Sequence, residues 1–168
     1  MAYLKRIKNP HLSQYIISFS QGNKVIIMSK YIEGENFDVF KGKGPQIILH
    51  DLKKILSGCL QGLLTLHENG IVHNDVRGQN IIIKPDFNSV IIDFGISCSF
   101  AKKLINNGVK PCLDKNLYKR DIMMLGAVFK DFGKTYKKGS KERIVVEKML
   151  DKKDKSDVRE LLGVLESP

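Results

Sequence analysis

Two short stretches of the sequence carry residues whose types and spacing could do chemistry. The first reads His-Asn-Asp-Val-Arg-Gly-Gln-Asn over 73–80, and the second reads Asp-Phe-Gly over 93–95. Asp75 is a carboxylate that could accept a proton from an attacking hydroxyl. Asn80 and Asp93 offer the carboxamide and carboxylate oxygens that Mg²⁺ prefers. A base beside two such oxygen ligands suits phosphoryl transfer, in which bound cations neutralise the phosphates.

The chain between the two stretches has the pattern of a strand hairpin. Apolar residues fill 81–83 and 90–92, and the turn-forming segment 85–89 separates them. This pattern predicts two short strands joined by a turn. The second strand would carry Asp93 back beside Asn80, which explains the distance between the two stretches. Either stretch alone is common, but both in this order, after an amphipathic helix, form a specific signature.

Apolar periodicity elsewhere predicts a chain that is mostly helical. Apolar runs at 15–19 and 25–28 flank Gln21-Gly22-Asn23, which predicts a hairpin. Apolar residues recurring at helical spacing over 46–67 predict a long helix that Asn69-Gly70 closes. Further helices are expected over 122–132, over 142–150 and after Ser156, whereas 96–120 is expected to be a loop.

Composition limits what the chain can be. Its 168 residues are 42% hydrophobic and 27% charged, which suits one globular domain. No apolar run approaches the roughly 18 residues that span a bilayer, so we expect no membrane partner. The three cysteines are irregularly spaced and the first residues resemble no signal peptide. We therefore expect reduced thiols and an intracellular location, in the cytoplasm or the nucleus.

The chain is strongly basic, with 28 basic and 18 acidic residues and a net charge of +10. Its lysines concentrate in 102–119 and 134–155. Such a surface either meets an acidic partner, such as nucleic acid or a phosphorylated surface, or is simply solvated. Each segment contains a single aromatic residue, Tyr118 or Tyr136, whereas a base-stacking surface requires repeated interleaving of aromatic residues with the lysines. The solvated surface is favoured, and nucleic acid is not an expected partner.

Residues 10–165 resemble the C-terminal lobe of the eukaryotic-type protein kinases. The resemblance rests on the two stretches above, on 25–36, which is similar to the hinge strand and connector, and on 118–126, which is similar to a buried helix of that lobe. It implies an α+β, mostly helical fold in a single domain. Residues 1–33 would be an N-lobe remnant with the hinge, and 34–168 would be the C-lobe.

The resemblance also assigns roles in the reaction. Asp75 would be the catalytic base, and Arg77 would contact the transferred phosphate. Asn80 and Asp93 would hold Mg²⁺. The implied activity is phosphoryl transfer from ATP to a protein hydroxyl, more often of Ser or Thr, with ATP and Mg²⁺ as cofactors.

Further roles follow for residues around the loop. The backbone of Lys30, Tyr31 and Ile32 would hydrogen-bond the adenine. Asp121 would anchor the backbone of the catalytic loop, and His73 would pack beneath it.

The sequence also departs from the family pattern. The only glycine before Gly34 is Gly22, and no acidic residue precedes Glu33, so a Gly-rich phosphate loop and the Lys–Glu ion pair are both missing. The segment 96–120 is short and contains no Ala-Pro-Glu. Asn74 replaces the usual Arg of His-Arg-Asp, which is the main charge partner of a phosphorylated loop. The chain therefore resembles a truncated form.

These departures leave several functions open. The first is a truncated protein kinase that still transfers phosphate. The second is a weak or dead pseudokinase that regulates other kinases or acts as a decoy. The third is a relative of the small-molecule or atypical kinases, and the last is a fragment of a longer kinase. The expected partner is a protein substrate or a partner kinase.

Overall fold

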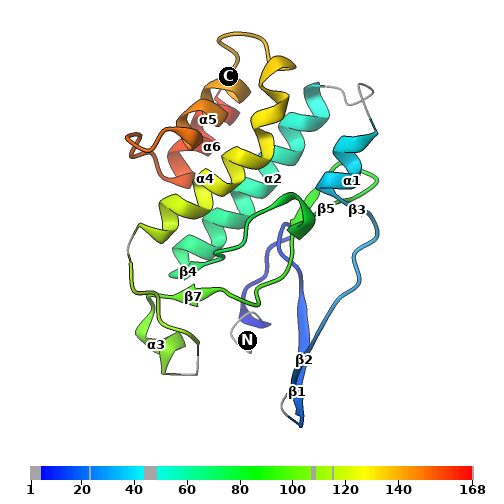
Figure 1. The fold of residues 1–168 in the computed structure, drawn as a ribbon, viewed down its shortest axis with the longest axis vertical. Coiled ribbons are helices and arrows are strands. Elements are labelled where there is room, and N and C mark those ends of the chain that lie inside the picture. The colour runs from blue at the N-terminus through cyan, green and yellow to red at the C-terminus, as the bar shows by residue number, and fades with distance from the viewer. Residues whose placement is uncertain (1–4, 23, 44–48, 107–108, 115, 168) are drawn as a thin grey trace.

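A bundle of helices forms one end of the molecule, and a strand hairpin projects from the other (Figure 1). The computed structural model describes residues 5–22, 24–43, 49–106, 109–114 and 116–167. Its mixture of helices and short strands is the α+β, mostly helical arrangement expected from the sequence. Among the helices of the described chain, none is long and apolar enough to cross a membrane.

The central helix of the bundle is α2 (Leu49–Glu68). Its apolar residues recur every three or four positions, so one face of the helix is apolar along its length. That face is fully buried, at Leu52, Ile55, Leu56, Cys59, Leu60, Leu63 and Leu66. Gly70 ends the turn after the helix with a φ of 70°, a conformation that favours glycine. The expected helix is confirmed, although 46–48 lie outside the described residues.

Three shorter helices complete the bundle: α4 (Leu117–Phe129), α5 (Lys141–Leu150) and α6 (Val158–Glu166). Helices α4 and α6 pack against α2, and α5 packs against α4 and α6. The Ser140 side chain caps α5, and Asp157 with Glu160 forms a capping box at the start of α6. The apolar face expected after Ser156 is buried. The boundaries expected for 122–132 were wrong, because α4 begins five residues earlier and a 3-10 turn, η3 (Lys130–Lys134), follows it.

The predicted hairpin in the middle of the chain is confirmed. β5 (Ile81–Ile83) pairs antiparallel with β6 (Ser89–Ile91). A two-residue strand, β3 (Glu35–Asn36), adds to the free edge of β5, and α1 (Phe37–Gly42) follows it directly. Neither β3 nor α1 was expected, because two and six residues are too short to show a periodic pattern.

The hairpin that projects from the body consists of β1 (Tyr15–Gln21) and β2 (Lys24–Ser29), as predicted. Ile17 lies opposite Met28, and Phe19 lies opposite Ile26. Because residues directly opposite each other share one face of a sheet, these four side chains form one apolar face. Three of them remain about half exposed, with Ile17 at 50%, Met28 at 49% and Phe19 at 46%.

The expectation of a loop over 96–120 was wrong. β7 (Cys98–Ser99) pairs with β4 (Ile71–Val72), and α3 (Lys102–Ile105) follows β7. The pairing partner of β7 lies far away in the sequence, so no local pattern could reveal it.

The expectation of three reduced thiols was also wrong. Cys98 and Cys112 form a disulfide, whereas Cys59 is a free, buried thiol. The chain turns back on itself through α3 and thereby brings the two cysteines together. Their spacing alone gave no sign of the pairing.

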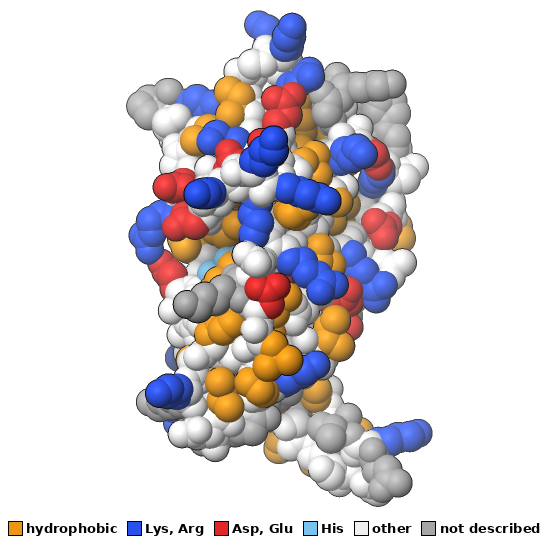
Figure 2. Space-filling view, turned by 60° about the vertical axis from the view of Figure 1, so that its left-hand side comes forward, with side chains coloured by type: hydrophobic (Ala, Val, Ile, Leu, Met, Phe, Trp, Pro, Cys, Tyr) orange, Lys and Arg blue, Asp and Glu red, His pale blue; other side chains and the backbone are white. Residues whose placement is uncertain are grey.

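Basic and acidic side chains are interspersed on one face of the molecule (Figure 2). Figure 2 shows Lys and Arg side chains over the helical end with acidic side chains between them. Ion pairs such as Arg143–Glu147 and Lys148–Asp154 join some of them. The solvated surface favoured by the sequence stays a prediction.

Candidate active site

The candidate site is centred on the loop 73–80, which connects β4 to β5 through the 3-10 turn η2 (Gly78–Asn80). The fully buried carboxylate of Asp121 holds the start of this loop from α4. Its Oδ2 accepts the backbone N–H of His73 at 2.8 Å, and its Oδ1 accepts that of Asn74 at 2.8 Å. The expected anchor of the loop is confirmed.

His73 packs beneath the loop and is fully buried, as expected. Its Nε2 lies 3.0 Å from the carbonyl oxygen of Ile92, and its ring centre lies 5.1 Å from that of Phe94. Burial lowers the pKa of His73, although the negative charge of Asp121 opposes this effect. The ring is therefore neutral near pH 7, with Nε2–H donating to Ile92 and Nδ1 accepting the backbone N–H of Asp75 at 3.2 Å.

The structure brings Asp75, Arg77 and Asn80 together. Asn80 donates from Nδ2 to the Asp75 carboxylate at 2.8 Å and to the Asp75 carbonyl oxygen at 2.9 Å. Arg77 Nε lies 3.3 Å from the same carboxylate oxygen. The Asp75 side chain keeps 25% of its surface exposed. A carboxylate held in this way has a fixed orientation and can still be reached from solvent.

Asp93 follows β6 and is exposed, with a φ of 63°. The residue before it donates its backbone N–H to the Asn80 carbonyl oxygen at 2.9 Å. The strand pair thus returns the chain to Asn80, as the spacing predicted. The Asp93 Oδ1 accepts the N–H of Gly95 at 3.1 Å, which fixes the turn.

The side-chain oxygens of Asn80 and Asp93 are the kind of ligand that a hard cation such as Mg²⁺ prefers. Both hydrogen bonds of the Asn80 side chain use its nitrogen, so its Oδ1 makes none with the described residues. Over the described ranges, no group of three or more His, Cys, Asp or Glu side chains could hold a metal ion. A metal at this site would therefore depend on one carboxylate and one carboxamide, together with phosphate oxygens and water, as is usual for Mg²⁺.

The helix α1 contributes a contact that the sequence did not suggest. Gly78 in the loop lies so close to Asp38 that a Cβ on Gly78 would be 1.9 Å from Asp38 Oδ1. A side chain at position 78 would require the Asp38 carboxylate to move away. Asp38 thus lies beside the candidate site, and the missed helix is the reason that it was overlooked.

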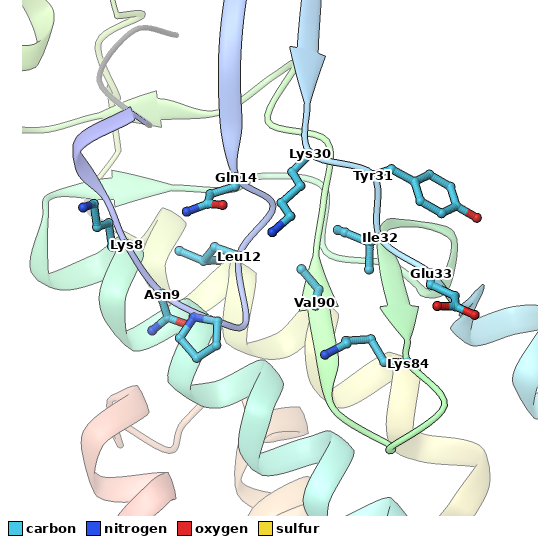
Figure 3. Close-up of a pocket in the computed structure, with 11 residues that line it drawn as sticks. Lys8, Asn9, Leu12, Gln14, Lys30, Tyr31, Ile32, Glu33, Lys84 and Val90 are labelled. Atoms are coloured by element: carbon cyan, nitrogen blue, oxygen red, sulfur yellow. The ribbon is translucent and has the colours of Figure 1, made fainter.

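The predicted adenine-binding residues follow β2. Lys30, Tyr31 and Ile32 all line a pocket of about 430 Å³ (Figure 3). Leu12 and Val90 also line this pocket, whereas Asp75, Asn80 and Asp93 do not. Residues 30–32 therefore line a different space from the candidate catalytic residues. The adenine contact from the backbone of 30–32 stays a prediction.

Asn74 replaces the Arg of the family's His-Arg-Asp motif and makes contacts that the sequence did not predict. It has a φ of 70°, a conformation that asparagine tolerates better than most residues. Its Nδ2 lies 3.3 Å from the Ile96 carbonyl oxygen and 3.3 Å from the Sγ of Cys98. The loop is therefore tied to the segment that follows Gly95.

A loop carboxylate paired with a carboxamide, an Asp-Phe-Gly turn and a buried anchoring Asp are together typical of kinase-like sites. Residues 1–112 match the family described as Protein kinase domain, and since this is more than half of the chain, the chain belongs to that family. The fold is accordingly kinase-like. The helices α4 to α6 lie beyond the matched residues.

Named protein kinases are among the similar proteins. The MAP kinase kinase kinase SSK2 of Saccharomyces cerevisiae is 35% identical over 113 residues, which cover 66% of this chain and 7% of that protein. The serine/threonine-protein kinase cds1 of Schizosaccharomyces pombe is 33% identical over 94 residues, covering 56% and 20%. The probable cyclin-dependent kinase 10 of Dictyostelium discoideum is 24% identical over 125 residues, covering 73% and 34%. The chain thus matches only about a third or less of each of these relatives.

Proposed function

We propose that this chain transfers a phosphoryl group from Mg-ATP to a hydroxyl of a protein, with Ser or Thr as the favoured acceptor. Asp75 accepts the proton of the attacking hydroxyl, and Arg77 contacts the transferred phosphate. Asn80 and Asp93 hold Mg²⁺, which when bound neutralises phosphate oxygens. The Ser/Thr acceptor and the protein substrate are supported by the similarity to serine/threonine-protein kinases alone.

One observation carries this proposal. The Asn80 amide donates two hydrogen bonds to Asp75, at 2.8 and 2.9 Å, while Asp121 anchors the start of the same loop. The candidate base and the candidate metal ligand therefore form one rigid unit. A rigid unit of this kind is what catalysis by positioning requires.

The domain organisation belongs to the same proposal. Residues 34–168 correspond to the C-lobe of a kinase, with the hinge and a remnant of N-lobe strands in 1–33. The position of β1 and β2 as a projecting hairpin before the helical body supports this division (Figure 1). The intracellular location stays a prediction.

Thermal unfolding with and without Mg-ATP tests nucleotide binding. A ligand at about 100 times its Kd stabilises the native state by about 2.7 kcal/mol, which shifts the unfolding midpoint by several degrees. We expect this shift in the unaltered chain and its loss in Asp93→Ala. Asp114→Ala, which removes an exposed carboxylate outside the site, should keep it. No shift in the unaltered chain would contradict nucleotide binding.

A phosphotransfer assay then tests the chemistry. Label from γ-labelled ATP should appear on an acceptor protein with the unaltered chain and fall by about 10²-fold or more with Asp75→Asn, since a general base contributes about 10²–10⁴-fold. Equal transfer by the two proteins would exclude Asp75 as the base.

A second candidate function is a non-catalytic regulator that pairs with another kinase. The apolar face of the β1–β2 hairpin favours it, because Ile17, Phe19 and Met28 remain about half exposed. A chain that binds a kinase but shows no transfer of label would support this function over the first.

A further inference from the structure

The Cys98–Cys112 disulfide closes part of the segment after Asp93-Phe94-Gly95 into a ring beside the catalytic loop. In β7, Cys98 pairs with Val72, the residue before His73. At the other end of the ring, the Cys112 N–H donates to the Ser99 carbonyl oxygen at 2.9 Å. The disulfide therefore joins β7, which pairs with the strand before the loop 73–80, to Cys112, where the chain comes back to β7.

The sulfur of Cys98 contacts the loop directly. Asn74 Nδ2 lies 3.3 Å from Cys98 Sγ, and Asn74 immediately precedes the proposed base Asp75. The other polar atom of this amide, Oδ1, is buried and has no hydrogen-bond partner among the described residues. The Asn74 side chain is thus engaged with the ring through its nitrogen alone.

We propose that the Cys98–Cys112 pair is a reversible redox modification site, at which a thiol reductant frees the ring segment from the catalytic loop. Asn74 stands where the family pattern has the Arg that binds a phosphorylated loop. In this chain a covalent bond, rather than a phosphate, orders the same segment. The link to catalysis rests on the function proposed above, whereas the modification itself does not.

The exchange with a dithiol reductant balances as follows. One thiolate of the reductant attacks the Sγ of Cys112, which is the more exposed of the two cysteines, and the S–S bond breaks. Cys98 leaves as a thiolate and takes up a proton. The second thiol of the reductant then attacks the mixed disulfide, which releases Cys112 as a thiol and leaves the reductant as a cyclic disulfide. Two electrons and two protons pass to the protein.

Two features make the site selective. The Asn74 N–H points at the sulfur that leaves and stabilises its negative charge, and a better leaving thiolate speeds the exchange. The third cysteine takes no part, because burial raises the pKa of the Cys59 thiol to about 12. A thiol that stays protonated is not a nucleophile.

Alkylation and limited proteolysis of the whole chain test the inference. After treatment with diamide, Cys98 and Cys112 should resist alkylation, and after treatment with dithiothreitol both should be alkylated. Trypsin should cut after the exposed Lys102 at least about tenfold faster in the reduced protein, because cleavage requires the segment to open locally. Alkylation of both cysteines after diamide, or equal cleavage rates in the two states, would overturn the inference.

Variants separate the disulfide from other effects of the reductant. Cys98→Ser combined with Cys112→Ser should be cut at the fast rate with and without dithiothreitol, whereas Cys59→Ala should keep the redox response. Asn74→Gly keeps the left-handed backbone and removes the amide, so it should slow reduction by about threefold or more. An unchanged rate of reduction would overturn the role assigned to Asn74.

Binding of Mg-ATP measured in both redox states keeps the two proposals apart. Weaker binding of Mg-ATP or slower phosphoryl transfer in one redox state would show that the disulfide ring is coupled to the candidate active site. If Mg-ATP stabilises neither state, the proposed function fails, while the cleavage rates still decide whether the ring is a redox site.

Discussion

The helical body and the β1–β2 hairpin both carry large apolar side chains, but only the body buries them. Along α2 the apolar face meets α4, α6 and β6, and its residues are fully buried. In the hairpin, opposite residues build an apolar face that stays about half exposed. A two-stranded hairpin has only one neighbour for each strand, so it is marginally stable alone. Burial therefore depends on the surface available to cover a side chain, and the chain supplies that surface for the body only.

The same substitution in the two regions gives the sharpest test of this difference. Phe129→Ala, in the body, should lower the free energy of unfolding by about 3–5 kcal/mol, because Phe129 is fully buried against Phe37. Phe19→Ala, in the hairpin, should lower it by less than about 1 kcal/mol. Denaturant unfolding of both variants measures the two changes. Equal losses would show that the hairpin is as well supported as the body.

The polar anchor of the body should give the next largest effect. Asp121→Asn leaves one of the two loop N–H groups without its acceptor, which should cost about 1–3 kcal/mol of unfolding free energy. Asp131→Asn changes an exposed carboxylate paired with Lys41 and should have a smaller effect, because solvent screens an exposed ion pair. Chemical denaturation compares the two. A larger loss for Asp131→Asn would contradict the anchoring role.

The pH dependence of stability tests how tightly the body encloses the loop. Burial lowers the pKa of His73 below its ordinary 6.5 in the folded state, so the unfolded chain binds a proton that the folded chain does not. Above pH 6.5 the histidine is neutral in both states and costs no stability. As the pH falls below 6.5, the unfolded chain takes up the proton, and the free energy of unfolding falls by at most about 1.4 kcal/mol per pH unit.

Unfolding midpoints between pH 5 and 8 measure this slope. His73→Gln should flatten it, whereas the same change at the exposed His50 should leave it in place. A slope that persists in His73→Gln would mean that other groups cause it.

The smallest effect on stability is expected when the apolar face of the β1–β2 hairpin is made polar. Ile17→Ser with Phe19→Ser should change the unfolding free energy by about 0.5 kcal/mol or less per site, since both side chains are about half exposed. The variant should, however, bind less of a hydrophobic dye than the unaltered chain, because an exposed apolar face is removed. Leu113→Ser, at an isolated exposed leucine, is the control. Unchanged dye binding would show that the hairpin face is not accessible.

Much of the fold could be predicted because its signals are local. The buried face of α2 recurs at helical spacing, and the turn segments before β2 and β6 separate clear apolar runs. The site residues Asp75 and Asn80 lie five positions apart in one loop, so their contact follows from the motif. The anchoring role of Asp121 came from the family resemblance, since 48 positions separate it from His73.

The elements that could not be predicted depend on distant contacts. β7 exists because β4 offers it a partner, and α1 is too short to show periodicity but packs Phe37 against Phe129 and Phe132. The closeness of Asp38 to Gly78 follows from that packing. Such contacts leave no regular spacing in the sequence.

The sequence by itself determined the chemistry that this protein could carry, because the types and order of Asp75, Asn80 and Asp93 are properties of the chain. It also determined the helices and hairpins whose periodicity is local. Only the tertiary structure decided how the loop is held and that Cys98 meets Cys112 beside Asn74. These outcomes depend on how elements far apart in the sequence pack together, and packing is a property of the folded chain as a whole.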